Sequence, residues 1–371
     1  SFLQERISEN GFPTFPPSIP HQANVYQAGF DATWEVDVFG GTRRAVEAAN
    51  ADISAAEYGR HQTLVSLLGE VARDYVEARG FQQRLIIARQ NIKSQGEALA
   101  LTRERFNAGL NSDLDVQQAA TLLATTEAQV PTFETGFKES AYRLGILLAQ
   151  PPGALLQELS KATPIPPAPP AVPVGLPAQL LQHRPDIQRA ERELAAANAR
   201  IGVAVADLFP KFSLTGNAGL QSVSTSDWFS AGSRFWTVGP AMQWRIFDAG
   251  RIRSNIRVQN ARQEEALVQY EQTVLASLED VESALTSYAQ ESIRRQSLAR
   301  AVQSSQQALQ IAGQLYRSGL ADYLSVLESQ RSLYQNQDLL AQSEQQVTVD
   351  VVSLYKALGG GWEGMPQTAM K

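Results

Sequence analysis

Two short stretches of the sequence, each built around a Gly-Leu pair, carry the side chains whose types and spacing could do chemistry. The first reads "NAGLNSDLDV" from residue 107, and the second reads "YRSGLADYLSVLESQR" from residue 316. Carboxylates, a phenol hydroxyl and a guanidinium group in such short stretches can hydrogen-bond one another and attract cations. The candidate residues are Asp113, Asp115, Tyr316, Asp322, Glu328 and Arg331.

The rest of the sequence offers no motif for catalysis. There is no nucleophile elbow, phosphate-binding loop, paired-carboxylate site or metal-ligand cluster, and "GGGW" from residue 359 lacks the Lys-Ser/Thr of a phosphate loop. The chain has no cysteine, and its three histidines, His21, His61 and His183, are far apart. The sequence therefore predicts a protein that is not an enzyme and has no cofactor or metal.

Helix capping is the competing explanation for the acidic residues. "SDLD" from Ser112 resembles a capping box, and Asp322 is a good N-cap for a helix that follows it. Capping explains Asp113 and Asp322 at least as well as a functional role does. Asp115 and Glu328 are further inside the expected helices, where capping explains them less well.

The two turns belong to an internal repeat whose halves are offset by 210 residues, as in Gly109 and Gly319. "WEVDVFGGTRR" from Trp34 matches "WRIFDAGRIRS" from Trp244, and "RFNAGLNSDLDV" matches "LYRSGLADYLSV" at the same offset. The apolar positions between these anchors keep the same register. Each half is therefore predicted to contain one strand, one very long helix, a tight turn and a returning helix.

The helices are expected to be the main elements of the chain. The two long helices would each extend about 100 Å at 1.5 Å per residue, and their apolar residues step by three and four, as in a coiled-coil seam. Two shorter helices placed end to end would match one long one. The expected ranges are 41–107 and 113–148 in a first hairpin at 41–149, a helix at 184–209, and 250–317 in a second hairpin at 250–358.

Three segments lack a helical pattern. Residues 150–183 form a Pro-rich connector, because proline cannot continue a helix. Residues 359–371 begin with three glycines and are expected to be a C-terminal tail. Residues 1–21 contain four prolines and are expected to form an extracellular loop.

Alternating apolar and polar residues predict a transmembrane strand at 22–39 and a transmembrane β-hairpin at 211–248. The two strands of the hairpin would be joined by an extracellular loop at 223–235. A soluble sheet with one wet face is commoner, but no second sheet is available to cover the apolar face. Three strands cannot close a barrel, so the chain must oligomerise, and the odd number suggests a further strand upstream of Ser1. Aromatic residues near the strand ends and in the loop are expected at the membrane interfaces: Trp34, Trp228, Phe229, Phe235, Trp236 and Trp244.

The composition and charge of the chain exclude some classes of protein. Of 371 residues, 43% are hydrophobic and 19% charged, and the net charge is −6, which gives no basic surface for nucleic acid. No apolar run is long enough for a membrane-spanning helix. "SFLQERISENG" does not resemble a natural start, so the chain is expected to begin inside a longer protein.

The sequence resembles the TolC-like outer membrane factors, in particular the lipoprotein branch that serves resistance-nodulation-division (RND) efflux pumps. The resemblance runs from about residue 22 to 362, and "LLQHRPDIQRAERELAAANARIGVAVADLFPKFSLTG" from residue 180 is its most specific motif, beside "WEVDVFG", "FDAGRIRS" and "YRSGLADYLSVLESQRSLY". It implies a mainly α-helical protein with a membrane β-barrel: a trimeric twelve-stranded outer-membrane barrel continued by a periplasmic α-helical barrel. Lipidation stays open, because the family's N-terminal part and its cysteine are absent from the sequence.

The resemblance also implies a periplasmic gate at the two turns. A tyrosine matching Tyr316 would hydrogen-bond an aspartate matching Asp115, and an acidic ring would match Glu328. The sequence departs from the best-known member at Ala321, where that member has arginine, and at Ser325, where it has an acid. Arg331 is then the expected substitute partner.

The implied function is a passive exit channel of a tripartite efflux system that expels drugs or other toxic compounds across the outer membrane of a Gram-negative bacterium. The implied partners are two further copies of the chain, outer-membrane lipid, a periplasmic adaptor protein and an inner-membrane RND transporter. Two alternatives remain: the same duct for type I protein secretion or heavy-metal export, and a soluble periplasmic coiled-coil scaffold.

Overall fold

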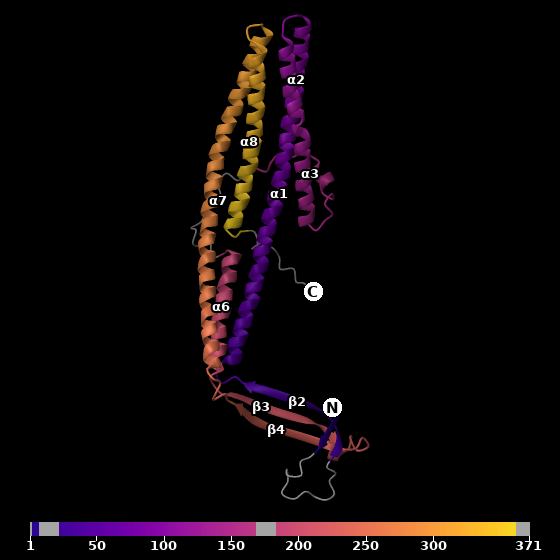
Figure 1. Cartoon of the computed structure of the whole chain (residues 1–371), viewed down its shortest axis with the longest axis vertical. Helices are drawn as coiled ribbons and strands as arrows, with labels where there is room; N and C mark the ends of the chain where they lie inside the picture. Colours follow the sequence, from indigo (N-terminus) through magenta and orange to yellow (C-terminus); the bar gives the residue numbers. More distant parts are fainter. Residues whose placement is uncertain (1, 7–21, 168–182, 361–371) are drawn as a thin grey trace. The chain divides into compact units, whose positions relative to one another are not determined.

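The computed structural model describes residues 2–6, 22–167 and 183–360, which are mainly helical with one small sheet (Figure 1). The chain divides into two compact units. Unit 1 comprises Ser1–Ser54 and Glu191–Gln269, and unit 2 comprises Ala55–Ala190 and Tyr270–Lys371. Within the described residues, no helix is both long and apolar enough to cross a membrane.

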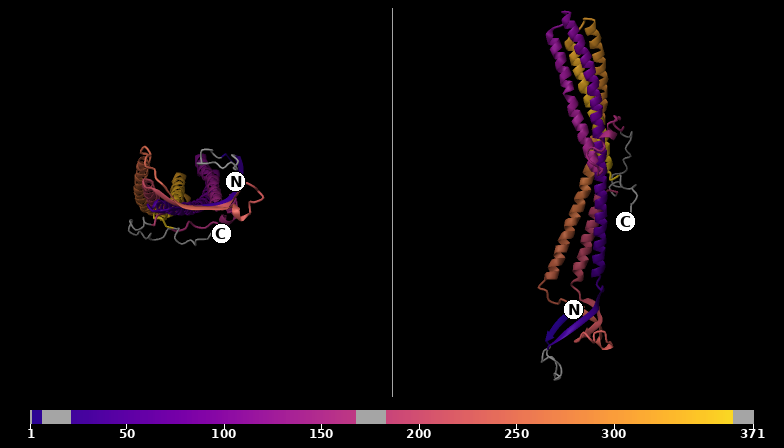
Figure 2. Two further views of the ribbon diagram at one scale, coloured as in Figure 1. Left: turned by 90° about the horizontal axis from the view of Figure 1, so that it is seen from below. Right: turned by 90° about the vertical axis from the view of Figure 1, so that its right-hand side faces the viewer.

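The sheet of unit 1 has four antiparallel strands in the order β1-β2-β3-β4. Figure 1 shows β2, β3 and β4 as neighbouring arrows, and Figure 2 shows the sheet from two further directions. β1 and β4 are edge strands, and Pro240, which has no N–H to donate, lies on the β4 edge. The strands are β1 (Phe2–Arg6), β2 (Gln22–Val36), β3 (Lys211–Ser222) and β4 (Arg234–Gln243), with a 3₁₀ turn, η2 (Ala231–Ser233), before β4.

The pairing register places the apolar residues of the three longer strands on one face. Trp34 pairs with Leu214, and Leu214 pairs with Pro240. The next residues, Thr33 and Thr215, pair with each other on the opposite face. The apolar face is open in the described chain: Phe30 is 90% exposed, Trp34 65% and Trp236 75%.

The ends of the strands differ from the expected ranges. The expectation that residues 1–21 form one loop is wrong for Phe2–Arg6, which pair with β2 as a fourth strand; residues 7–21 lie outside the described residues. A strand of five residues is too short to show an alternating pattern in the sequence. β2 ends at Val36, before the expected end at 39, because Asp37 caps the helix that follows. β4 ends at Gln243, before the expected end at 248.

The two long helices, α1 (Gly41–Asn107) and α7 (Arg251–Arg317), have 67 residues each. Each follows a glycine with positive φ, +82° at Gly40 and +83° at Gly250. The Asp37 carboxylate accepts hydrogen bonds from the N–H groups of Thr42 and Arg43 at 3.1 and 2.9 Å. Asp248 accepts from the N–H groups of Gly250 and Ile252 at 3.0 and 2.7 Å. These carboxylates satisfy N–H groups that have no partner within the helix.

The returning part of the first hairpin is two helices, α2 (Asp113–Glu127) and α3 (Gln129–Leu147), and not the single helix expected at 113–148. The break falls at Ala128 because Pro131 has no N–H for the carbonyl of Glu127 and is tolerated only in the first turn of a new helix. In the second hairpin, α8 (Tyr323–Ala357) is unbroken.

The Pro-rich connector contains a helical turn, α4 (Leu156–Leu159), which the expected connector at 150–183 did not include. Leu159 is buried with Ala141 and Leu144 of α3, so packing orders this Pro-free stretch. Arg79 and Gln82 of α1 donate hydrogen bonds to the Leu159 carbonyl at 3.1 and 2.6 Å. Residues 168–182 lie outside the described residues. α6 (Pro185–Ala206) follows.

Candidate functional site at the helical turns

The two hairpin turns of unit 2 have the same backbone structure. Gly109 and Gly319 both have φ of +73°, a conformation that glycine adopts without steric cost. The Leu110 N–H donates to the Arg105 carbonyl at 2.8 Å, and the Leu320 N–H donates to the Leu315 carbonyl at 2.9 Å. This hydrogen-bond pattern ends α1 and α7 as Schellman motifs.

Ser112 and Asp115 form the capping box of α2. The Asp115 N–H donates to Ser112 Oγ at 3.3 Å, and the Ser112 N–H donates to Asp115 Oδ2 at 3.1 Å. Capping therefore accounts for Asp115 better than the sequence suggested. Asp113 is the first residue of α2 and not its cap, and it accepts a long hydrogen bond of 3.4 Å from Gln117.

Asp322 is the N-cap of α8. Its Oδ1 accepts from the Ser325 hydroxyl at 2.8 Å and from the Ser325 N–H at 3.2 Å. These bonds favour the charged form and lower the pKa of the Asp322 carboxyl. The stabilisation is therefore present above the ordinary aspartate pKa and is lost as the pH falls through the lowered pKa.

Tyr316 does not bond to Asp115 within the protomer. Its hydroxyl accepts a hydrogen bond from Asn111 Nδ2 at 2.8 Å. Arg105 joins both residues: its Nε donates to Asn111 Oδ1 at 3.2 Å, and its Nη1 donates to the Tyr316 carbonyl at 3.1 Å. The guanidinium carbon of Arg105 also lies 4.6 Å from the centre of the Tyr316 ring. Asp115 is occupied by its capping box. We call Arg105, Asn111 and Tyr316 the turn clasp, because they tie the first hairpin to the second.

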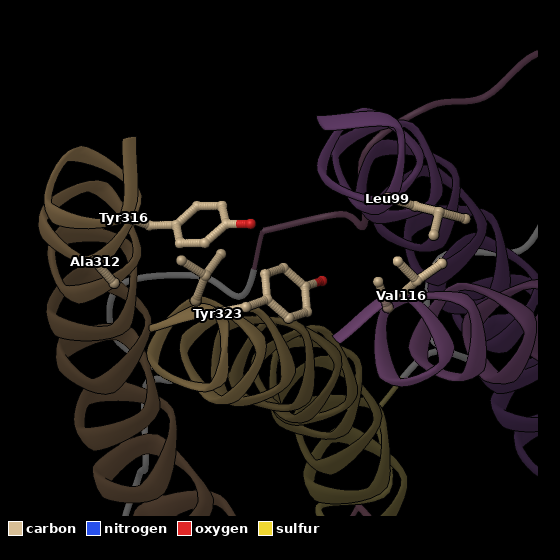
Figure 3. Packing of buried hydrophobic residues seen from close by; sticks show 7 residues of the cluster. Leu99, Val116, Ala312, Tyr316 and Tyr323 are labelled. Atoms are coloured by element: carbon tan, nitrogen blue, oxygen red, sulfur yellow. The ribbon is translucent and has the colours of Figure 1, made fainter. Parts of the chain in front are cut away.

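Tyr316 of the turn clasp belongs to an apolar cluster formed by both hairpins (Figure 3). Leu99 and Val116 come from the first hairpin, and Ala312, Tyr316 and Tyr323 come from the second. The rings of Tyr316 and Tyr323 meet edge to face at 5.6 Å. Burial of the Tyr323 hydroxyl raises its pKa to about 12, so it stays neutral.

Glu328 and Arg331 lie one turn apart on α8, and both are exposed. Neither has a hydrogen bond or ion pair with another described residue, so Arg331 does not act within the protomer as the substitute partner that the sequence suggested. Four leucines at the turns are also exposed, by 48% to 77%: Leu110, Leu114, Leu320 and Leu324.

Sequence reasoning missed Arg105 and Asn111. The signal that could have found Asn111 is an asymmetry between the two turns, since Asn111 of the first corresponds to Ala321 of the second. Arg105 gives no such signal, because arginine is ordinary in the last turn of a helix.

The aromatic residues fall into different environments. Trp34, Trp236 and Phe229 are 65%, 75% and 84% exposed. The indoles of Trp228 and Trp244 are held by hydrogen bonds. Trp228 Nε1 donates to the Leu220 carbonyl at 3.4 Å, and Trp244 Nε1 donates to the Leu208 carbonyl at 3.1 Å.

Phe235 differs from the aromatic residues of the apolar face. It pairs with Gly219, one residue out of phase with Trp236, so it points to the polar face. Its ring fills the space beside Gly219, where an added Cβ would lie 3.0 Å from it. Alternation therefore turns its ring away from the rings of Trp34 and Trp236.

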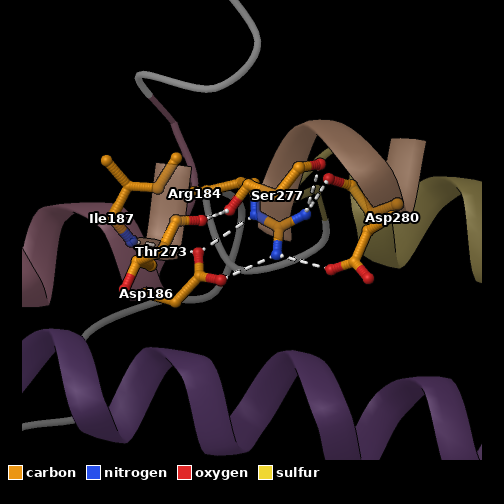
Figure 4. Close-up of polar contacts among 7 residues, drawn as sticks. Arg184, Asp186, Ile187, Thr273, Ser277 and Asp280 are labelled. Carbon is orange, nitrogen blue, oxygen red and sulfur yellow. Dashed lines mark hydrogen bonds and ion pairs between the residues drawn. The ribbon is translucent and has the colours of Figure 1, made fainter. Parts of the chain in front are cut away.

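A buried arginine joins the start of α6 and the end of α8 to the middle of α7, in the region of the most specific sequence motif (Figure 4). Arg184, 8% exposed, donates to the Ala357 carbonyl of α8 at 2.7 Å. It also donates to Asp186 at 2.7 and 3.0 Å and to Asp280 of α7 at 3.0 Å. Although burial opposes its charge, the two carboxylates raise the pKa of Arg184. The cluster is structural: it holds the end of α8 against the start of α6.

The described residues contain no group of three or more metal-binding side chains. The arrangement at the turns offers hydrogen bonds and charges, and it has no nucleophile beside a base. The hydrogen bonds at the site can therefore hold the two hairpins together, and its exposed charges can attract or repel ions.

The class that this architecture defines is that of the outer-membrane channel proteins of efflux systems. The chain matches the sequence profile of the family described as "Outer membrane efflux protein" over residues 18–150 and 176–360. It is 34% identical over 339 residues to Nodulation protein T of Rhizobium leguminosarum bv. viciae, covering 91% of this chain and 70% of that protein. It is 33% identical over 358 residues to the solvent efflux pump outer membrane protein SrpC of Pseudomonas putida, covering 96% and 75%.

The solved structure of the outer-membrane channel OprN is similar over 98% of this chain and 80% of that chain, with a TM-score of 0.89 and 37% identity. The chain thus belongs to the outer membrane efflux protein family, and the resemblance seen in the sequence is confirmed. It is an outer-membrane efflux channel protein of a Gram-negative bacterium. The alternative of a soluble scaffold is wrong. The family consists of transport channels and not of enzymes.

Proposed function

We propose that three copies of this chain form one passive exit channel. Each copy would contribute its four strands to a closed barrel of twelve in the outer membrane, and the helices would continue as a second barrel in the periplasm. A periplasmic adaptor and an inner-membrane RND transporter would deliver the cargo and the energy.

The observation that carries this proposal is the open apolar face of a sheet with two free edges. Leu214, at 43% exposed, lies on this face among larger exposed rings. Lipid can cover such a face, but unpaired edge strands are not tolerated in the hydrocarbon layer. Pairing β4 of one copy with β1 of the next would remove both edges. The polar face, with Thr33 and Thr215, would line the lumen.

We also propose that the two halves of the chain are an internal repeat offset by 210 residues. The equal lengths of α1 and α7 support it. So do the matching φ angles, +82° and +83° at Gly40 and Gly250, and +73° at both Gly109 and Gly319.

The gate would lie at the two turns. The turn clasp supports this, because it holds the second hairpin against the first, and its release would let the hairpins separate. The exposed carboxylates of Glu328 from three copies would form a ring around the pore. Asp113, Asp115 and Asp322 would stabilise the conformation of the two turns. Arg331 would be available to contact a neighbouring copy.

The cargo would be small toxic organic compounds. The name of SrpC says that it serves solvent efflux, and the three methionines of this chain do not suggest a methionine relay for copper. Protein secretion through the same type of duct is the alternative, and export assays with the partner pump would separate the two.

Planar-bilayer recording tests the channel and its acidic ring together. The purified protein should give discrete conductance steps that select cations over anions. Glu328→Gln keeps the shape and removes three charges per channel, so the cation-to-anion permeability ratio should fall several-fold. Glu104→Gln, an exposed carboxylate at the end of α1, is the matched control and should leave the ratio unchanged. Absence of conductance steps would refute the proposal, and equal ratios would remove Glu328 from the gate.

A further inference from the structure

The segment that joins β4 to α7 in unit 1 exposes large apolar side chains. Ile246 is 81% exposed, Phe247 91% and Trp244 51%. The Trp244 ring is held in place by its hydrogen bond to the Leu208 carbonyl. The segment is therefore an ordered apolar surface that the described chain does not cover.

Three exposed arginines without carboxylate partners accompany this surface. Arg245, Arg253 and Arg257 have no ion pair with any described residue, and the polar contact of Arg257 is the Ser254 hydroxyl at 3.1 Å. Several other cations of unit 1 are paired with carboxylates at 2.5 to 3.2 Å: Arg43 with Asp37, Arg44 with Glu47, Arg192 with Glu191, Arg200 with Asp52 and Lys211 with Asp207.

The capping aspartates at the starts of α1 and α7 differ in whether they also pair with an arginine. At the start of α1, Asp37 caps the helix and also accepts from Arg43 Nε at 3.2 Å, which neutralises that arginine. At the start of α7, Asp248 is used by two backbone N–H groups and does not pair with Arg253 at all. The positive charge of Arg253 is thus not neutralised by an ion pair within the described residues.

Exposed aromatic and aliphatic side chains next to unpaired arginines match the chemistry of a bilayer surface. The apolar groups can enter the acyl boundary, and guanidinium groups bind phosphate oxygens in a bidentate manner. We propose that residues 244–257 bind the headgroups of anionic phospholipids in the leaflet on the helical side of the membrane. This inference rests on the proposed membrane barrel, because that barrel places the helix-proximal strand ends at this leaflet.

Titration of the purified trimer in neutral detergent with a short-chain, water-soluble phosphatidylglycerol tests the proposal. We expect phosphatidylglycerol to bind and short-chain phosphatidylcholine to bind much more weakly. The triple variant Arg245→Gln/Arg253→Gln/Arg257→Gln should weaken phosphatidylglycerol binding about a hundredfold, which corresponds to about 1 kcal/mol per arginine. The same three positions changed to lysine should keep most of the affinity.

The matched control is Arg294→Gln/Arg295→Gln/Arg300→Gln, an equal loss of charge further along α7, which should leave binding unchanged. Inorganic phosphate should not displace the lipid, because the apolar side chains contribute to its binding. Equal binding of the two lipids, or equal loss in the control, would overturn the proposal. So would dissociation of the glutamine variant into monomers without any lipid dependence, since the surface would then be a contact between copies. A failed barrel would instead abolish conductance in every variant.

Discussion

Replacing Arg105 by alanine should open the channel. The change removes two hydrogen bonds and the contact with the Tyr316 ring, and a single such bond contributes about 1 kcal/mol. If the three copies open together, even about 1 kcal/mol in each shifts the ratio of closed to open channels by roughly a hundredfold. Tyr316→Phe removes only the bond from Asn111 and should give a smaller shift in the same direction.

Single-channel recording measures this shift as open probability. Arg103→Ala is the matched control, because Arg103 is exposed on α1 two residues before Arg105 and is not part of the turn clasp. All variants should remain trimers in detergent. If Arg105→Ala and Tyr316→Phe record like the control, the turn clasp serves only to end two helices, and the gate must lie elsewhere.

Leu214→Arg should prevent assembly in the membrane. Leu214 pairs with Trp34 and Pro240 in the middle of the sheet, so the new charge would face lipid near the midplane. Such a substitution costs about 2 to 4 kcal/mol in each copy, and a trimer carries it three times. The amount of folded trimer in the outer-membrane fraction should therefore fall severely.

Thr215→Arg is the adjacent control on the opposite face. It places the same side chain in the aqueous lumen and should assemble at nearly the level of the parent protein, with an altered conductance. Equal loss for both variants, or normal assembly of Leu214→Arg, would show that the assignment of the faces is wrong.

Much of the fold could be predicted because its signals are local. Gly109 and Gly319 mark turns, Ser112 and Asp322 mark helix starts, and the range expected for α1 agrees with Gly41–Asn107. Alternation in β2 and β3 separates an apolar face from a polar one, and the register keeps that separation across the sheet. Each of these features depends on residues close together in the chain.

The remaining features depend on partners far apart in the chain. Phe2–Arg6 form a strand only because β2 pairs with them, and α4 is ordered by packing on α3. Asn111 and Tyr316 are 205 residues apart, so no spacing in the sequence indicates their bond. The face of the sheet on which Phe235 lies is likewise decided by its pairing with Gly219 of another strand.

One chain should supply only part of the channel, and three copies should complete it. The molar mass of the protein part of the detergent complex, measured by light scattering coupled to size-exclusion chromatography, tests this most directly. We expect a single species with the mass of three chains, which shifts to one chain only after heating. A single-chain mass in mild detergent, from a sample that still conducts ions in bilayers, would contradict it.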